Sequence, residues 1–170
     1  MKLAELLRDV PVNGIQGDDQ LDITLVTPDS RLVRDGALFV AIAGTAKDGA
    51  AFIPMAIEKG ARVIVAETPQ TNANRGLTTV LVDDARAALS LIASNFYGRP
   101  ADKLSLVGVT GTSGKTTTTR MIESVFDAEG GPVGLIGTIE YRAGDERLVA
   151  DRTTPDAVVL QEWFAKMIEA

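Results

Sequence analysis

Residues 108–119 read GVTGTSGKTTTT, and their glycines, lysine and hydroxyls make this the segment best suited to chemistry. The segment lies between an apolar run at 104–109, which predicts a strand, and a helical pattern that starts at Lys115. Backbone N–H groups exposed by glycines at a helix N-terminus bind phosphate, a lysine at the end reaches the outer phosphates, and the following hydroxyl can ligate Mg²⁺. We therefore predict a triphosphate site in which Gly111, Gly114, Lys115 and Thr116 take these roles.

The match to a phosphate loop is a short one. The pattern G-x-x-x-x-G-K-[ST] is not met, because Val109 stands five residues before Gly114, and the chain fits the shorter G-x-x-G-K-T. The alternative is a glycine turn that caps a helix and leaves Lys115 in solvent; the strand, loop and helix context favours phosphate binding. A phosphate loop by itself names neither the nucleotide nor the reaction. The N-K-x-D segment typical of GTPases does not occur.

The predicted site also needs a carboxylate for the metal on a neighbouring strand. The predicted strand at 132–137, PVGLIG, contains none. We therefore expect residues 104–170 to be the first part of a nucleotide-binding domain whose remaining strands follow residue 170.

For two other polar segments, a purely structural role explains the residues as well as a binding role does. Asp29-Ser30-Arg31 follows a proline and predicts a turn in which Asp29 and Ser30 bond their own backbone. In TTPD at 153–156, the residues favour a helix start with Thr154 as the N-cap and Asp156 complementing the helix dipole. The alternative is that the hydroxyls and amides of this segment bind an anionic or amide-bearing substrate.

Composition excludes several kinds of chemistry. The 170 residues include no cysteine and no histidine, which rules out disulfides, thiolate sites, an imidazole base and a histidine metal ligand within the chain. A formal charge of −6 with 5% aromatic residues argues against a nucleic-acid surface. Charged residues interrupt the first apolar stretch, and no apolar run approaches the roughly 18 residues that a membrane span needs. We expect a cytoplasmic protein with neither nucleic-acid nor membrane partners.

Strand-like and helix-like patterns alternate along the chain, which predicts an α/β fold with mostly parallel sheets. A glycine and a proline after residue 97 place a domain boundary there, so we expect domains at 1–101 and 102–170. The expected buried stripes are Ala87, Ala88, Leu91, Ile92 and Phe96 on one helix and Trp163, Phe164, Met167 and Ile168 on the last. Helices are predicted at 3–8, 51–60, 83–98, 115–130 and from about 155; strands at 22–26, 37–44, 61–67, 78–82, 104–109 and 132–137, with a hairpin-like region up to 152.

Taken together, the motifs resemble the Mur ligases, and most closely those of the MurE type. The resemblance rests on TPDSRLVRDGALFVAIAG at 27–44, KDGAAFIPMAIEKGA at 47–61, the phosphate loop, GLIGTI at 134–139 and TTPD at 153–156. The TTP segment separates this type from the MurF type, which shares the DSR and phosphate-loop signals. The resemblance implies an N-terminal α/β uridine-nucleotide domain at 1–101 and the incomplete start, at 102–170, of a central ATP-binding domain with a parallel sheet.

The resemblance also implies site residues and a reaction. Gly111, Thr112, Ser113, Gly114, Lys115, Thr116 and Thr117 would bind ATP, with Lys115 on the phosphates and Thr116 on Mg²⁺. Pro28, Ser30, Thr45, Ala46 and Lys47 would contact the uridine nucleotide, and Arg152, Thr153 and Thr154 the muramoyl-dipeptide.

The implied reaction belongs to peptidoglycan synthesis. ATP would phosphorylate the terminal carboxylate of UDP-N-acetylmuramoyl-L-Ala-D-Glu, and a diamino acid, diaminopimelate or lysine, would then attack to form an amide. The family's remaining metal and amino-acid ligands would follow residue 170, so we expect this chain alone to be inactive. The alternatives are another Mur ligase, of the MurF type, and a stand-alone nucleotide-binding module.

Overall fold

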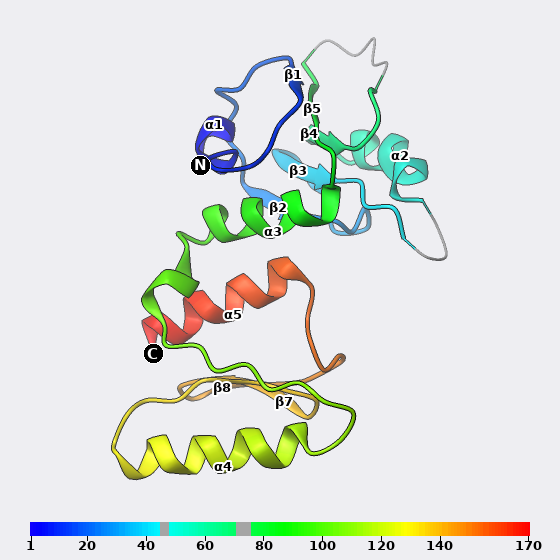
Figure 1. The fold of residues 1–170 in the computed structure, drawn as a ribbon. Coiled ribbons are helices and arrows are strands. Elements are labelled where there is room, and N and C mark those ends of the chain that lie inside the picture. The colour runs from blue at the N-terminus through cyan, green and yellow to red at the C-terminus, as the bar shows by residue number, and fades with distance from the viewer. Residues whose placement is uncertain (45–47, 71–75) are drawn as a thin grey trace. The chain divides into compact units, whose positions relative to one another are not determined.

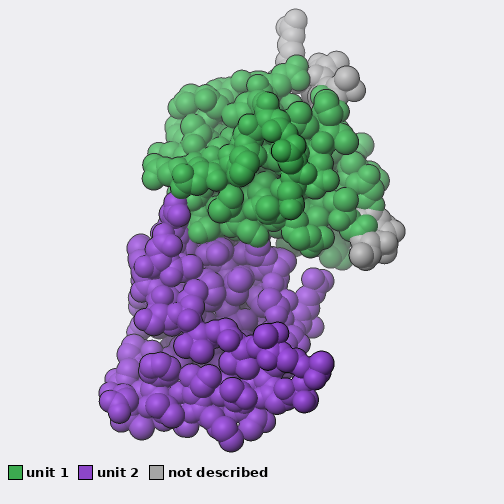
Figure 2. Space-filling view, in the orientation of Figure 1, with its two compact units in different colours: residues 1–96 green, residues 97–170 purple. Residues whose placement is uncertain are grey.

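The computed structural model describes residues 1–44, 48–70 and 76–170, which form two compact units, Met1–Phe96 and Tyr97–Ala170 (Figures 1 and 2). Within the described ranges, none of the helices combines the length and the apolar character needed to span a bilayer.

The first unit is built on a five-stranded sheet in the order β1-β5-β4-β3-β2. Four of its strands run parallel, and β1 alone pairs antiparallel, with β5. Strands β3 and β4 carry almost only buried residues, as expected for central strands covered on both faces. The elements are α1 Leu3–Leu6, β1 Gly14–Gln16, β2 Leu25–Thr27, β3 Ala37–Val40, the 3₁₀ turn η1 Gly49–Phe52, α2 Ile53–Glu58, β4 Ala61–Ala66, β5 Thr78–Leu81 and α3 Ala85–Phe96.

Helix α2 covers one face of this sheet. Its Ile53 and Ala56 pack with Phe39 of β3 and Ile64 of β4 in one apolar cluster. Side chains alternate along a strand, so the equally buried Leu38 and its neighbours point to the opposite face. The sheet therefore forms the middle layer of an α/β unit, as the alternating sequence patterns predict.

The second unit contains a smaller sheet. Strands β6, β7 and β8 pair antiparallel in that order, and a Gly144-Asp145 turn with Gly144 at φ +54° joins β7 to β8. The sheet lies between α4 and α5 (Figure 1). On α5, the indole of Trp163 meets the ring of Tyr141 edge-on at 5.9 Å. The elements are the 3₁₀ turn η2 Pro100–Lys103, α4 Lys115–Ala128, β6 Leu135–Ile136, β7 Glu140–Ala143, β8 Glu146–Val149 and α5 Ala157–Glu169.

The expected parallel arrangement holds in the first unit, whereas the strands described in the second unit are antiparallel. Residues 104–109, predicted to be a strand, pair with no described strand, and their Leu106 and Val107 are 52% and 59% exposed. An apolar run becomes a strand only where a second backbone supplies hydrogen bonds. The strand predicted at 132–137 is confined to Leu135–Ile136 for the same reason.

Several predicted boundaries and stripes are also corrected. The strand predicted at 22–26 begins at Leu25, and the one predicted at 37–44 ends at Val40. On α3 the predicted Ala87 and Leu91 are exposed, and Ala85, Leu89 and Ala93 are buried beside Ala88 and Ile92. The buried face of α3 is thus rotated by part of a turn from the predicted one. The spacing of apolar residues does not specify the angle at which the helix packs on the sheet. On α5, Ile168 is exposed.

Candidate functional site

The predicted phosphate loop joins residues 104–109 to α4. Gly114 caps the helix with φ +79°, a left-handed conformation that only glycine adopts at low cost, and its carbonyl accepts the first helical bond from the Thr118 amide at 2.9 Å. The Lys115 ammonium folds back and donates to the Gly111 carbonyl at 2.5 Å. The lysine is thus held within the loop, next to the helix N-terminus at which the predicted phosphate site would lie.

A pocket of about 420 Å³ opens in front of this loop. It brings Lys115 and Thr116 together with Thr153 and Thr154, which lie far away in the sequence. Of the other residues predicted for ATP, Gly111 lines the pocket, whereas Thr112, Ser113, Gly114 and Thr117 do not. Its remaining wall comes from residues 107–110, from Thr119 and Arg120 of α4, and from residues 135–140.

The segment that carries Thr153 and Thr154 is held by two side chains of the sheet region. The Tyr141 hydroxyl donates to the Arg152 carbonyl at 2.6 Å, and the Thr138 and Thr153 hydroxyls lie 3.4 Å apart. Burial, together with the nearby Asp151 charge, raises the pKa of Tyr141, so that its hydroxyl stays a donor. The exposed Arg152 side chain does not line the pocket.

The start of α5 differs from the prediction. Asp156, not Thr154, is the N-cap, and its Oδ1 accepts from the amides of Val158 and Val159 at 3.0 and 3.1 Å. A carboxylate satisfies two of the free amides of the first turn, which a single hydroxyl cannot do as well. Thr154 therefore does not cap the helix, and it lines the pocket.

Five charged residues form a network beside the pocket that the sequence reasoning missed. Arg120 bonds Glu123 at 2.8 Å and Glu140 at 2.6 Å, Glu123 also pairs with Arg142, and Arg147 lies 4.0 Å from Glu140. Burial, followed by the charges of Arg147 and Arg120, lowers the pKa of Arg142. One signal was present in the sequence: Arg120 stands four residues after Thr116, on the same helix face.

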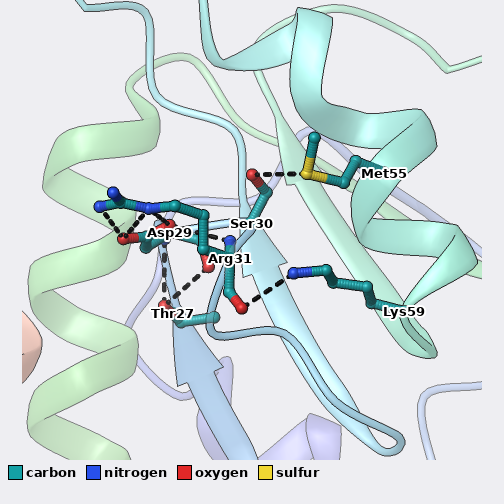
Figure 3. A network of polar contacts seen from close by, with 6 residues as sticks. All are labelled: Thr27, Asp29, Ser30, Arg31, Met55 and Lys59. Atoms are coloured by element: carbon teal, nitrogen blue, oxygen red, sulfur yellow. Dashed lines mark hydrogen bonds and ion pairs between the residues drawn. The ribbon is translucent and has the colours of Figure 1, made fainter.

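In the first unit, the predicted uridine loop is a network of turn contacts (Figure 3). The Asp29 carboxylate accepts from the Arg31 amide at 2.9 Å and from its guanidinium at 2.6 Å, and Lys59 donates to the Arg31 carbonyl at 2.9 Å. The hydrogen bond from Arg31 holds the pKa of Asp29 below its usual value. Ser30, only 7% exposed, places its hydroxyl 3.5 Å from the Met55 sulfur.

The other predicted uridine contacts are Pro28, Thr45, Ala46 and Lys47. Pro28 is half-buried in this loop. Thr45, Ala46 and Lys47 lie outside the described residues. Over residues 1–44, 48–70 and 76–170, no group of three or more acidic side chains is gathered as a metal site. The Thr116 hydroxyl remains the candidate ligand for Mg²⁺.

Fold and site together define a protein of the α/β class with a glycine-rich loop that opens onto a pocket at the head of a helix. Two family models match its sequence: "Mur ligase family, catalytic domain" over residues 22–97 and "Mur ligase middle domain" over residues 109–170. The two matches together span most of the chain, one in each unit. The chain belongs to the Mur ligase family.

Curated relatives are similar over the whole of this chain. The UDP-N-acetylmuramoyl-L-alanyl-D-glutamate–2,6-diaminopimelate ligase of Clostridium tetani is 44% identical over 100% of the chain and 36% of its own length. The ligase of the same name from Alkaliphilus metalliredigens is 43% identical over 99% of the chain and 34% of its own length. The chain thus spans about a third of the length of these relatives.

Solved structures agree in fold. A UDP-N-acetylmuramoyl-L-alanyl-D-glutamate–2,6-diaminopimelate ligase matches with a TM-score of 0.73 and 22% identity over 99% of this chain and 34% of its own. The MurF ligase of Thermotoga maritima in complex with ADP matches with a TM-score of 0.51 and 26% identity over 86% of this chain and 30% of its own.

Proposed function

We propose that the protein carrying this chain is an ATP-dependent ligase of peptidoglycan synthesis. It joins a diamino acid to UDP-N-acetylmuramoyl-L-Ala-D-Glu, and the names of the relatives favour diaminopimelate over lysine. The observation that carries the proposal is the pocket that unites Lys115 and Thr116 of the phosphate loop with Thr153 and Thr154. A site for such a reaction needs a phosphate donor and an acceptor carboxylate in one place.

In this proposal the loop from Gly111 to Thr117 binds the phosphates of ATP through its amides, with Lys115 on the outer phosphates. The ADP held by the Thermotoga maritima relative supports a nucleotide here. A hydroxyl oxygen is a fitting ligand for Mg²⁺, so Thr116, which lines the pocket, would hold the ion. When bound, Mg²⁺ would neutralise charge on the phosphates; the loop amides and Lys115 would orient them and stabilise the transferred group.

The acceptor is bound by the other side of the pocket. Thr153 and Thr154, with the adjoining Arg152, would hold the muramoyl-dipeptide so that its terminal carboxylate faces the last phosphate of ATP. Transfer of that phosphate gives an acyl phosphate and ADP. The incoming amine then attacks the carbonyl carbon, an amide forms and phosphate leaves. Catalysis of this kind rests on positioning and electrostatics.

The uridine end of the substrate would be bound by the first domain, residues 1–101, and the ATP end by the second, from residue 102. Pro28, Ser30, Thr45, Ala46 and Lys47 are the proposed contacts. Since Ser30 is turned toward Met55, we expect its contribution to come from the backbone of the loop rather than from its hydroxyl. We also propose a cytoplasmic location, where ATP and the nucleotide-linked substrate are found.

The decisive test is Lys115→Ala, with the exposed Lys103→Ala in the same unit as the matched control. The first variant should abolish ATP binding and turnover yet keep binding of the UDP-linked substrate, measured by calorimetry with each ligand alone; the control should keep both. Equal loss of both ligands would contradict separate sites. The 170-residue chain alone should form no amide; ATP-dependent amide formation by it would overturn that expectation.

A second candidate is a ligase of the MurF type. The crystal structure of MurF from Acinetobacter baumannii matches with a TM-score of 0.58 over 97% of this chain. Offering the dipeptide and tripeptide forms of the UDP-muramoyl substrate side by side to the longest protein that carries this sequence separates the two. Turnover of the tripeptide form alone would favour the MurF type. Comparing turnover with diaminopimelate and turnover with lysine would identify the amino acid. A stand-alone module would bind nucleotide and turn over neither.

A further inference from the structure

Helix α4, which begins at the phosphate loop, is attached to its unit mainly by charge. Its one buried residue is Glu123. Its large apolar side chains Met121, Val125 and Phe126 are 63%, 63% and 46% exposed. A helix normally docks through an apolar stripe, which fixes its position by close packing. In the described part of this chain, Ile122 is the one partly buried large apolar residue of α4, so the position of the helix depends strongly on the groups that surround Glu123.

Those groups belong to β7, on the α4 side of the small sheet. Tyr141 and Ala143 point toward α5, so the alternation of the strand turns Glu140 and Arg142 toward α4. Arg142 pairs with Glu123, and Arg120 bridges Glu123 and Glu140 at 2.8 and 2.6 Å.

Three of the four side chains in these ion pairs are largely removed from water, whereas Arg120 is 39% exposed. The side chains of Glu123, Glu140 and Arg142 are 8%, 17% and 18% exposed. Ion pairs in such surroundings depend strongly on geometry, and removing one partner leaves an uncompensated charge. The bridge made by Arg120 links α4 to β7, and both terminal guanidinium nitrogens already bond carboxylates rather than a ligand.

The link lies in the wall of the pocket. Arg120 follows Thr116 by one helical turn, and both Arg120 and Glu140 line the pocket wall. The residue after Glu140 is Tyr141, whose hydroxyl holds the Arg152 carbonyl next to Thr153. A continuous series of contacts thus runs from the phosphate loop, through Arg120 and Glu140, to the segment proposed to bind the acceptor.

We propose that Arg120 and Glu140 are positioning residues that set the spacing between the phosphate loop and the Thr153-Thr154 segment. The inference rests on the proposed function, since the spacing matters for transfer from ATP to a carboxylate. Neither residue needs to touch a reacting atom. Loss of the bridge should leave each half of the site intact and allow the distance between them to vary.

The first measurement does not depend on activity. Because the chain has no cysteine, spin labels can be placed at Val125→Cys on α4 and Val149→Cys on β8, where the native side chains are 63% and 85% exposed. Pulsed dipolar spectroscopy on the labelled chain should show a narrow distance distribution that broadens in Arg120→Met and in the milder Glu140→Gln. Arg120→Lys, which keeps the charge, should broaden it less. Glu146→Gln, which breaks the pair of Glu146 with Lys166 on the other side of the hairpin, is the control and should leave it narrow.

The second measurement is kinetic, on the longest protein that carries this sequence. Arg120→Met and Glu140→Gln should lower kcat by about tenfold or more, because a displacement of about 1 Å between reacting groups can cost about a hundredfold in rate, and should leave the KM for ATP nearly unchanged. Unchanged distance distributions in both variants would overturn the inference. A rise in the KM for ATP without a loss of kcat would also overturn it, because that result would make Arg120 a phosphate ligand. Absence of ATP binding in the unsubstituted protein would refute the proposed function instead, and the distance measurement would still decide the positioning role.

Discussion

The hydroxyl of Tyr141 offers a clean test of how residues 152–154 are held. Tyr141→Phe removes one oxygen from a residue that is 1% exposed. The ring and its edge-on contact with Trp163 remain, so the packing of α5 on β7 is preserved. The substitution therefore isolates the hydrogen bond from the hydroxyl to the Arg152 carbonyl, which is 2.6 Å long.

The expected cost follows from the surroundings of the two partners. A neutral hydrogen bond within a protein contributes about 0.5–1.5 kcal/mol net, and more is lost only when the remaining partner is buried without an acceptor or donor. The hydrogen bond is only part-buried, so water can replace the lost hydroxyl at the Arg152 carbonyl. We expect a loss of about 1 kcal/mol in the free energy of unfolding. Deleting the ring in Tyr141→Ala should cost about 3–5 kcal/mol, because a cavity is added.

Trp163 provides the assay. It is the only tryptophan in the chain, is 3% exposed and reports on the unit that contains Tyr141. Urea unfolding followed by its fluorescence should give a lower midpoint for Tyr141→Phe with an unchanged slope. The raised pKa of Tyr141 means that the protonated folded form is favoured. The contribution of the Tyr141 hydroxyl to the free energy of unfolding is full below the ordinary pKa of 10.0 and is lost as the pH rises above it. The difference in stability between the unsubstituted protein and Tyr141→Phe should therefore shrink in alkaline solution.

Two results would refute this reasoning. A change below about 0.3 kcal/mol would mean that the hydroxyl does not hold the segment, because even a weak net hydrogen bond exceeds that value. A loss as large as that of Tyr141→Ala would mean that the ring itself has moved. Either outcome would also remove Tyr141 from the series of contacts that joins Arg120 to Thr153.

Three further predictions concern other parts of the chain. Gly114→Ala should destabilise the loop by about 1–2 kcal/mol, because a side chain is strained at φ +79°, and should weaken nucleotide binding in calorimetry. The pKa of Asp29 in the folded protein, measured by NMR titration, should lie below 3.8. The contribution of Asp29 to stability is therefore full above pH 3.8 and is lost as the pH falls through the pKa of the folded protein. Arg31→Ala should raise that pKa. Asp156→Ala should cost about 1 kcal/mol in the fluorescence assay, whereas Thr154→Val should leave stability unchanged if Asp156 is the N-cap.

Much of the fold could be predicted because its signals are local. The β4 and β5 strands and the start of α4 lie where apolar runs and the glycine at 114 place them. The turn at Asp29-Ser30-Arg31 formed as predicted for Asp29, whose carboxylate bonds a backbone amide two residues on, whereas the Ser30 hydroxyl contacts the Met55 sulfur instead of its own backbone. Such features depend on neighbouring residues, whose conformational preferences are properties of the sequence.

The errors have a common cause. Whether residues 104–109 become a strand depends on a second backbone, and which face of α3 is buried depends on the angle at which the helix meets the sheet. At the start of α5, two adjacent candidates competed for the N-cap, and the carboxylate of Asp156 satisfied two amides where Thr154 offered one hydroxyl. Sequence patterns rank such alternatives, but packing selects among them.

The sequence by itself determined the glycine loop before α4, since glycine at a left-handed position and a lysine at the head of a helix are specified within a few residues. Only the tertiary structure decided what this loop faces. The convergence of Lys115 with Thr153 and the bridge from Arg120 to Glu140 join segments far apart in the chain. Their meeting depends on the pairing of β7 with its neighbours and on the alternation of its side chains, so it exists only once the sheet has formed.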